Sequence, residues 1–148
     1  HISSDHWNVG CSVNPRYHHQ EFVPSEINLP KAETKKHVVI LGGGPAGMKA
    51  AITASDRGHK VTIIEKQKEL GGMLRFISKE AHKEEVQRLL DYYLTQIFKR
   101  EIEVLLNTEA DPELVKELQP DSLLIAFGAV ERILPIPGVE GEKVQLAT

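Results

Sequence analysis

The sequence GGGPAG at residues 42–47 restricts the fold of this chain more than any other feature. It follows Val38–Leu41, a short apolar run typical of a strand buried on both faces of a parallel sheet. Residues 48–57 come next and are alanine-rich and helix-favouring, and Gly58 lies where a left-handed helix cap is needed. A strand, a glycine-rich loop and a helix in this order predict a dinucleotide-binding βαβ unit.

Three of the four glycines of the loop have an expected role. Gly42 permits the tight turn, Gly44 lets a pyrophosphate approach the backbone, and Gly47 lets the helix pack closely on the strand. The N–H groups of the first helical turn and the helix dipole favour phosphate binding there, and Pro45 sits where no N–H is needed. The predicted cofactor-binding residues of the loop are Gly42, Gly43, Gly44, Pro45, Ala46 and Gly47.

An acidic residue completes the pattern. Val61–Ile64 is a second, β-branched strand, and Glu65 follows it, 18 residues after Gly47. A carboxylate at this position accepts hydrogen bonds from a ribose diol and repels a 2′-phosphate. We therefore expect a pocket that prefers FAD, ADP or NAD over NADP.

The rest of the chain alternates helices and strands. Apolar side chains at helical spacing between residues 86 and 97 predict one buried helix stripe, and the charges from Lys79 to Glu103 are interpreted as its solvated face. Strands are predicted at 102–106 and 122–126, with a short helix from the N-cap Asp111 to Leu118 between them. This order predicts an α/β fold with a Rossmann-like, doubly wound parallel sheet.

The chain divides into three predicted parts. Residues 1–35 lack a sustained period and are expected to form an irregular N-terminal arm. Residues 36–130 form the predicted nucleotide-binding domain, and residues 131–148, rich in proline, form a connector. Because the chain opens on His1 and stops at Thr148, we interpret it as a piece of a longer protein.

Composition narrows the classes of function. With 148 residues, 41% apolar and 26% charged, the chain is typical of a globular domain. A net charge of -3 without a basic stripe argues against nucleic-acid binding, and no apolar run approaches the roughly 20 residues that span a membrane. The single cysteine, Cys11, cannot form an internal disulfide, which fits a reducing compartment and predicts a cytoplasmic location.

With these residues in place, the chain resembles the iron–sulfur flavoenzymes related to 2,4-dienoyl-CoA reductase, enoate reductase and trimethylamine dehydrogenase, the NADH:flavin oxidoreductases. The segment CSVNP at residues 11–15, so close before the loop, is the most discriminating match. The matching stretches are Cys11–Pro15, the GGGPAG loop, Arg57–Val61, Glu65-Lys66, Leu70-Gly71-Gly72, Asn107-Thr108 and Ala126–Ala129.

The resemblance implies further site residues and cofactors. It adds Lys66, Gly72, Ala126 and Gly128 to the cofactor-binding residues, with FAD as the cofactor. It also implies that Cys11 is the last ligand of an iron–sulfur cluster whose other ligands lie upstream. In such enzymes an FMN-bearing TIM barrel precedes this domain and an NAD(P)H domain follows it, so the cluster, FMN and NAD(P)H are expected only in the full-length protein.

Two positions depart from the family pattern. Phe127 stands where the family usually has threonine in Ala-Thr-Gly, and Met73 follows Leu-Gly-Gly where glutamine is common. Both changes remove polar groups near the flavin end of the cofactor. ADP is therefore kept as an alternative, because members related to trimethylamine dehydrogenase hold ADP in this domain.

The predicted function is that of an FAD-binding electron-transfer domain of an NAD(P)H-dependent flavin oxidoreductase. The redox chemistry belongs to the flavin, and no residue of this chain is assigned a catalytic role. We expect the full-length protein to be an oxidoreductase and this chain alone to be inactive. The alternatives are a non-catalytic module that binds ADP for structure, and an NAD-dependent dehydrogenase domain.

Overall fold

The computed structural model describes residues 11, 14, 16–17, 19–25, 28–130 and 132–145. Within these residues, a parallel sheet of four strands forms the centre, in the order β3-β2-β1-β4. The strands are β1 (His37–Leu41), β2 (Lys60–Ile64), β3 (Ile102–Leu105) and β4 (Ser122–Ile125). The chain adds β2 and β3 on one side of β1 and then crosses to the other side for β4, which confirms the predicted doubly wound arrangement.

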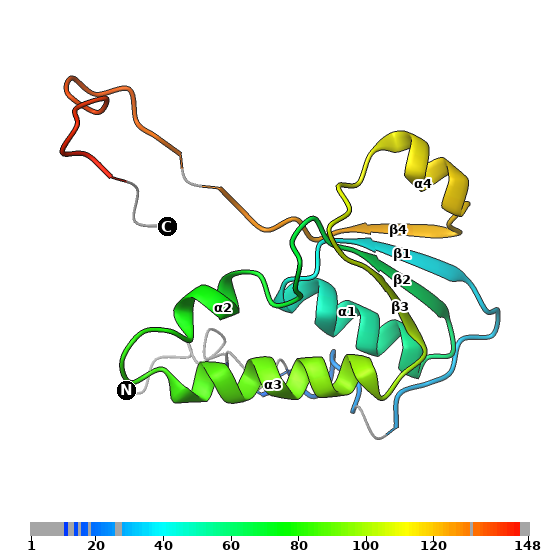
Figure 1. Cartoon of the computed structure of the whole chain (residues 1–148). Coiled ribbons are helices and arrows are strands. Elements are labelled where there is room, and N and C mark those ends of the chain that lie inside the picture. The colour runs from blue at the N-terminus through cyan, green and yellow to red at the C-terminus, as the bar shows by residue number, and fades with distance from the viewer. Residues whose placement is uncertain are drawn as a thin grey trace, which may run out of the picture.

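Helices cover both faces of the sheet, as Figure 1 shows. They are α1 (Pro45–Asp56), α2 (Met73–Ile77), α3 (Glu84–Phe98) and α4 (Pro112–Leu118). Successive residues of a strand point to opposite faces. Ile40 and Ile63 therefore join the core under α1 and α3, whereas Val39 and Ile64 join a smaller core under α4.

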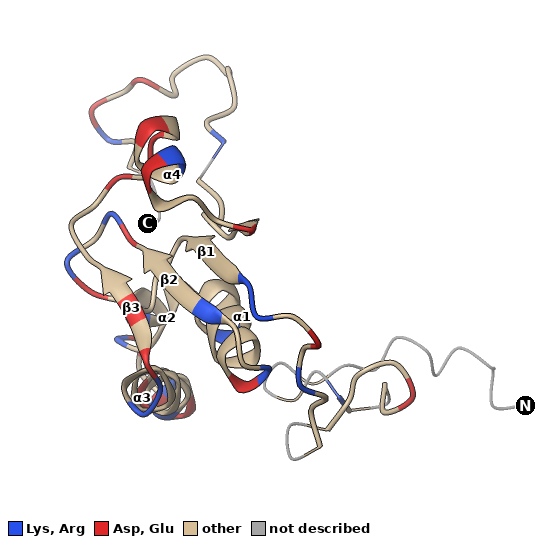
Figure 2. Ribbon diagram, turned by 90° about the vertical axis from the view of Figure 1, so that its right-hand side faces the viewer, with Lys and Arg blue, Asp and Glu red and all other residues tan. Residues whose placement is uncertain are grey.

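Helix α3 carries the predicted apolar stripe. Leu90, Tyr93 and Ile97 are buried in the larger core, where the tyrosine packs as a core residue. Basic and acidic residues lie side by side on the same helix, which Figure 2 views along its axis. The interpretation of these charges as a solvated helix face is confirmed for α3 itself, whereas Arg100, just beyond its end, is half-buried.

The predicted helix ends are also observed. Gly58 follows the last residues of α1 with a φ of 95°, the left-handed conformation expected of it. The Asp111 side chain caps α4 by accepting a hydrogen bond from the Leu114 N–H at 2.7 Å. Gln119 then takes a left-handed conformation and ends this helix before Pro120.

Some boundaries differ from the prediction. Helix α1 is not among them, since it begins at Pro45, the predicted place near the helix start, with Gly44 as its N-cap. Strand β4 ends at Ile125, although the Ala126 N–H still donates to Leu41, a difference typical of strand ends. Strand β3 likewise ends at 105 instead of 106.

The short helix α2 was not predicted. It has five residues, and its N-cap, Gly72, has no side chain with which to make a capping hydrogen bond. A helix without an N-cap side chain and shorter than two turns leaves neither a capping signal nor a period in the sequence.

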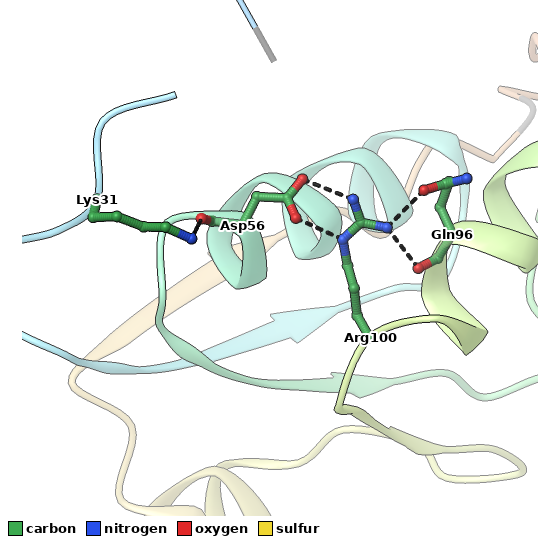
Figure 3. Close-up of polar contacts among 4 residues, drawn as sticks. All are labelled: Lys31, Asp56, Gln96 and Arg100. Atoms are coloured by element: carbon green, nitrogen blue, oxygen red, sulfur yellow. Dashed lines mark hydrogen bonds and ion pairs between the residues drawn. The ribbon is translucent and has the colours of Figure 1, made fainter. Parts of the chain in front are cut away.

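An ion pair joins the two helices of the larger core layer (Figure 3). The Arg100 guanidinium donates to both carboxylate oxygens of Asp56 at 2.8 Å, and to the side chain of Gln96 at 2.7 Å. The Lys31 ammonium donates to the Asp56 carbonyl at 2.6 Å. These contacts tie the end of α1 to the end of α3 and to the segment that enters β1.

The ends of the chain are less regular. The described part of residues 11–35 contains turns and bends, as expected of the irregular arm. After β4, residues 132–145 run away from the sheet (Figure 1). Across the described part of the chain, no helix has both the length and the apolar composition needed to cross a membrane.

Candidate functional site

The GGGPAG loop connects β1 to α1 at the carboxyl end of the sheet. Gly42 has a φ of 107°, and its N–H donates to the Ile64 carbonyl at 2.8 Å. A Cβ on Gly42 would collide with the backbone carbonyl of Ala126, and a Cβ on Gly47 would collide with that of Gly42. The predicted roles of these two glycines, the tight turn and the close helix packing, are confirmed.

Gly44 faces open space instead. It is the N-cap of α1, and a Cβ built on it would have no atom within 4 Å. Pro45 is the first helical residue, and residues 45–48, the described first turn, include no acidic side chain. The N–H groups of Ala46 and Gly47 have no carbonyl within the helix to reach, so this end of α1 favours an anion.

Glu65 lies where β2 ends, next to the loop. Its side chain is buried, with 8% of the residue exposed. One carboxylate oxygen accepts the Gly43 N–H at 2.6 Å and the other accepts the Gln67 N–H at 2.8 Å. The sequence placed this acid at the site, but the hydrogen bond to the loop was not predicted.

The segment Leu70-Gly71-Gly72 packs behind the loop. The Gly71 N–H donates to the Gly43 carbonyl at 2.8 Å, and Leu70 is buried against Gly43. Gly72 has a φ of 50°, and a Cβ there would lie 3.1 Å from the Cα of Gly44. Gly72 therefore stands beside the predicted phosphate site, as the resemblance implied.

A pocket of about 560 Å³ opens between the loop and the carboxyl ends of the strands. Most of the predicted site residues outside the loop border it. Its lining residues are Gly42, Ile64, Glu65, Lys66, Thr108, Glu109, Ala110 and Phe127–Val130. This volume lies in the usual range of small-molecule sites. Ala126 adjoins the pocket, between the last residue of β4 and Phe127.

Residues 108–110 line this pocket but were not among the predicted site residues. Thr108 follows β3, and its N–H donates to the Glu65 carbonyl at 3.0 Å, which brings this segment to the pocket. The signal available in the sequence was positional, since the carboxyl ends of parallel strands meet at one edge of the sheet.

Of the two departures from the family pattern, Phe127 lines the pocket on the side of β4. Phe127 is 65% exposed, and Gly128 has a φ of 76° with open space around it. Met73, at the start of α2, is 49% exposed. Phe127 and the residues after it give the β4 side of the pocket an apolar, exposed wall, whereas Met73 does not line this pocket.

Cys11 lies on the surface of the described arm, where its sulfur accepts the Asn14 N–H at 3.4 Å. Among the described residues, no group of three or more His, Cys, Asp or Glu side chains is arranged to hold a metal ion. The predicted cluster ligation by Cys11 stays a prediction.

The family model described as pyridine nucleotide-disulphide oxidoreductase matches residues 36–148. The chain is 41% identical to an NADH oxidase of Thermoanaerobacter brockii over 133 residues, 89% of this chain and 20% of that protein. It is 39% identical to a cinnamate reductase of Clostridium sporogenes, over 89% of this chain and 19% of that protein. The chain thus spans about a fifth of the length of these relatives.

Solved structures agree with the sequence relatives. A 2-naphthoyl-CoA reductase in complex with 2-naphthoyl-CoA superimposes with a TM-score of 0.82 at 38% identity, over 90% of this chain and 20% of that one. A histamine dehydrogenase from Rhizobium sp. 4-9 superimposes with a TM-score of 0.76 at 26% identity, over 84% of this chain and 19% of that one. The chain therefore belongs to the pyridine nucleotide-disulphide oxidoreductase family, among the flavoenzymes related to 2,4-dienoyl-CoA reductase, enoate reductase and trimethylamine dehydrogenase.

Proposed function

We propose that this chain binds FAD through the ADP half of the cofactor and serves as an electron-transfer domain of an NAD(P)H-dependent flavin oxidoreductase. The observation that carries the proposal is Gly44, which leaves open space at the amino end of α1, beside the 560 Å³ pocket. A pyrophosphate in that space would meet backbone N–H groups and the positive end of the helix dipole.

The pocket suits the adenosine end of such a cofactor. Glu65 offers carboxylate lone pairs to ribose hydroxyls, with Lys66 and residues 108–110 around the same cavity. The negative charge of Glu65 disfavours a 2′-phosphate. Bound FAD would supply the redox chemistry, while the residues of this chain bind and orient it.

The larger assembly is also a proposal. FMN, an iron–sulfur cluster with Cys11 as one ligand, and an NAD(P)H domain would belong to the full-length protein, of which the arm 1–35, the domain 36–130 and the connector 131–148 form one portion. The support is the resemblance to multi-cofactor flavoenzymes and the short span of the relatives that this chain covers.

Isothermal titration of the purified chain with FAD and with ADP tests the proposal. Gly44→Val should abolish binding because its side chain fills the space for the pyrophosphate, while the chain stays folded, since no atom lies within 4 Å of that Cβ and only the N-cap preference for glycine is lost. Absence of FAD and ADP binding to the wild-type chain, or full binding by Gly44→Val, would refute the site.

A second candidate is a module that binds ADP for structure alone. The apolar, exposed side chains of Phe127 and Met73 favour it, because they offer no polar group to a flavin ring. Mass spectrometry of the nucleotide released on denaturation separates the two candidates. ADP without FAD supports the structural module, and FAD excludes it.

A further inference from the structure

We propose that the Glu65 carboxylate is a positioning residue that fixes the shape of the phosphate loop, through its hydrogen bond to the Gly43 N–H. This role is separate from any contact of Glu65 with a ribose, and it rests on the proposed function in that the loop is the pyrophosphate site. It also accounts for Gly43, the glycine of GGGPAG to which the turn, approach and packing roles assign nothing.

The Gly43 backbone is held from two sides. Its N–H donates to Glu65 at 2.6 Å, and its carbonyl accepts the Gly71 N–H at 2.8 Å. Gly43 is buried, and both of these polar groups are directed into the protein. With Gly43 turned inward, the next N–H donors along the chain, from Gly44 onward, are left for an anion on the open side.

Glu65 is itself fixed on several sides. Its N–H donates to the Leu105 carbonyl at 2.9 Å, and its carbonyl accepts the Thr108 N–H at 3.0 Å. Its second carboxylate oxygen accepts the Gln67 N–H. The carboxylate is thus an anchored acceptor, and two N–H donors offset the cost of burying its charge.

The space around Gly43 requires this arrangement. A Cβ there would lie 3.1 Å from the bonded carboxylate oxygen of Glu65 and would collide with the Leu70 side chain. Glycine lets the backbone donate to this buried carboxylate without displacing the Leu70 side chain. The loop sequence and Glu65 are therefore parts of one structure.

The positioning role and simple charge repulsion predict opposite changes in phosphate affinity when Glu65 is replaced. If Glu65 acts by charge alone, its removal strengthens the binding of an anion in the same pocket. If Glu65 holds the loop, its removal weakens that binding because the N–H donors lose their alignment. Inorganic pyrophosphate is the right probe, since it has no ribose for Glu65 to contact.

The variants are chosen to remove acceptors in steps. Glu65→Gln keeps the shape of the side chain but offers one acceptor oxygen to two N–H donors, and Glu65→Leu offers none. Glu109→Gln is the comparison for charge, because it removes a carboxylate from the same pocket at an exposed residue. Pyrophosphate and ADP affinities are measured by titration for each protein.

We expect pyrophosphate affinity to fall at least about tenfold in Glu65→Leu, the loss of one charged hydrogen bond, and by less in Glu65→Gln. Glu109→Gln should raise it. Lower ADP affinity with unchanged or higher pyrophosphate affinity in the Glu65 variants would overturn the positioning role and leave a ribose contact. A wild-type chain that binds neither ligand refutes the proposed function instead.

Amide exchange measured without ligand tests the role of Glu65 even if the chain binds neither pyrophosphate nor ADP. In the wild-type chain the Gly43 amide proton should exchange slowly with solvent and show a scalar coupling across its hydrogen bond to the Glu65 carboxylate carbon. In Glu65→Gln, the Gly43 or the Gln67 amide should exchange at least about tenfold faster, and the amide resonances of Gly44, Ala46 and Gly47 should shift. Fast exchange of the Gly43 amide in the wild-type chain would overturn the inference.

Discussion

Strands β2 and β4 flank β1 on its two sides, in the same direction and in matching register. Leu41 of β1 is paired with Ile64 on one side and with Ile125 on the other. Ile64 is 2% exposed, whereas Ile125 is 67% exposed. These two isoleucines pair with the same residue and point to the same face of the sheet, yet one is buried and the other exposed.

The difference comes from what covers each strand. Strand β2 lies between β1 and β3, with α1 and α3 on one face and α4 on the other. Strand β4 is at the edge of the described sheet, and its residue Leu124 borders an open groove along α1. Yet its sequence, SLLI, is that of a strand buried on both faces.

The same contrast runs through the pocket. The wall from β2 is rigid, because Glu65, Leu70 and Gly71 hold the loop from behind. The wall from β4 consists of exposed residues such as Phe127. In the proposed function, the pyrophosphate would lie on the β2 side, and the choice between FAD and ADP would arise on the β4 side.

The largest expected effect tests the β2 side. Ile64→Ala should lower the free energy of unfolding by about 2–5 kcal/mol, because it leaves a cavity under α4 in a fully packed position. Urea unfolding followed by circular dichroism measures the change. A loss below about 1 kcal/mol would mean that α4 shifts to fill the cavity, and that it packs less tightly on β2 than the burial of Ile64 indicates.

The next effect separates two glycines of the loop. Gly47→Ala should cost about 1–3 kcal/mol, because its Cβ meets the backbone carbonyl of Gly42 and the helix has to move away from the strand. Gly44→Ala is the matched control and should cost less than about 1 kcal/mol, since its Cβ meets nothing and only the N-cap preference for glycine is lost. Equal losses in both variants would contradict the packing role of Gly47.

A smaller effect concerns the layer that covers β2. Arg100→Met should cost about 1–2 kcal/mol, since Asp56 loses a two-point, partly buried ion pair. Arg88→Met is the control, because its pair with Glu85 is exposed, and it should change stability by less than about 0.5 kcal/mol. Thermal unfolding of both variants at the same ionic strength checks the difference, and an equal loss would show that the Asp56 pair stabilises the fold no more than the exposed pair of Arg88 and Glu85.

Local signals explain how much of this fold was predictable. Val38–Leu41, the loop and Gly58 each carry a backbone requirement that only a strand, a tight turn and a helix end satisfy, so the first βαβ unit followed from sequence. Asp111 gave the start of α4 for the same reason. Helix α2 lacks any capping side chain and was missed.

The sequence predicts the residues of the candidate site whose chemical type is itself informative. It does not predict those that reach the pocket only through strand pairing. The loop glycines are recognisable because they lack a side chain, and Glu65 is recognisable because it is acidic. Residues 108–110 reach the pocket only because β3 pairs with β2, which is a long-range fact. The bond between Glu65 and Gly43 likewise depends on how far β2 extends beside β1, and no local pattern encodes it.

The smallest expected effect returns to β4. Ile125→Ala should change the free energy of unfolding by less than about 0.5 kcal/mol, because an exposed side chain leaves no cavity behind. The measurement is the same urea unfolding used for Ile64→Ala, so the two isoleucines are compared directly. A loss close to that of Ile64→Ala would show that β4 is covered in solution. Sedimentation at several protein concentrations would then show what covers β4. A mass that rises with concentration indicates a second copy, and a constant monomer mass indicates the connector of the same chain.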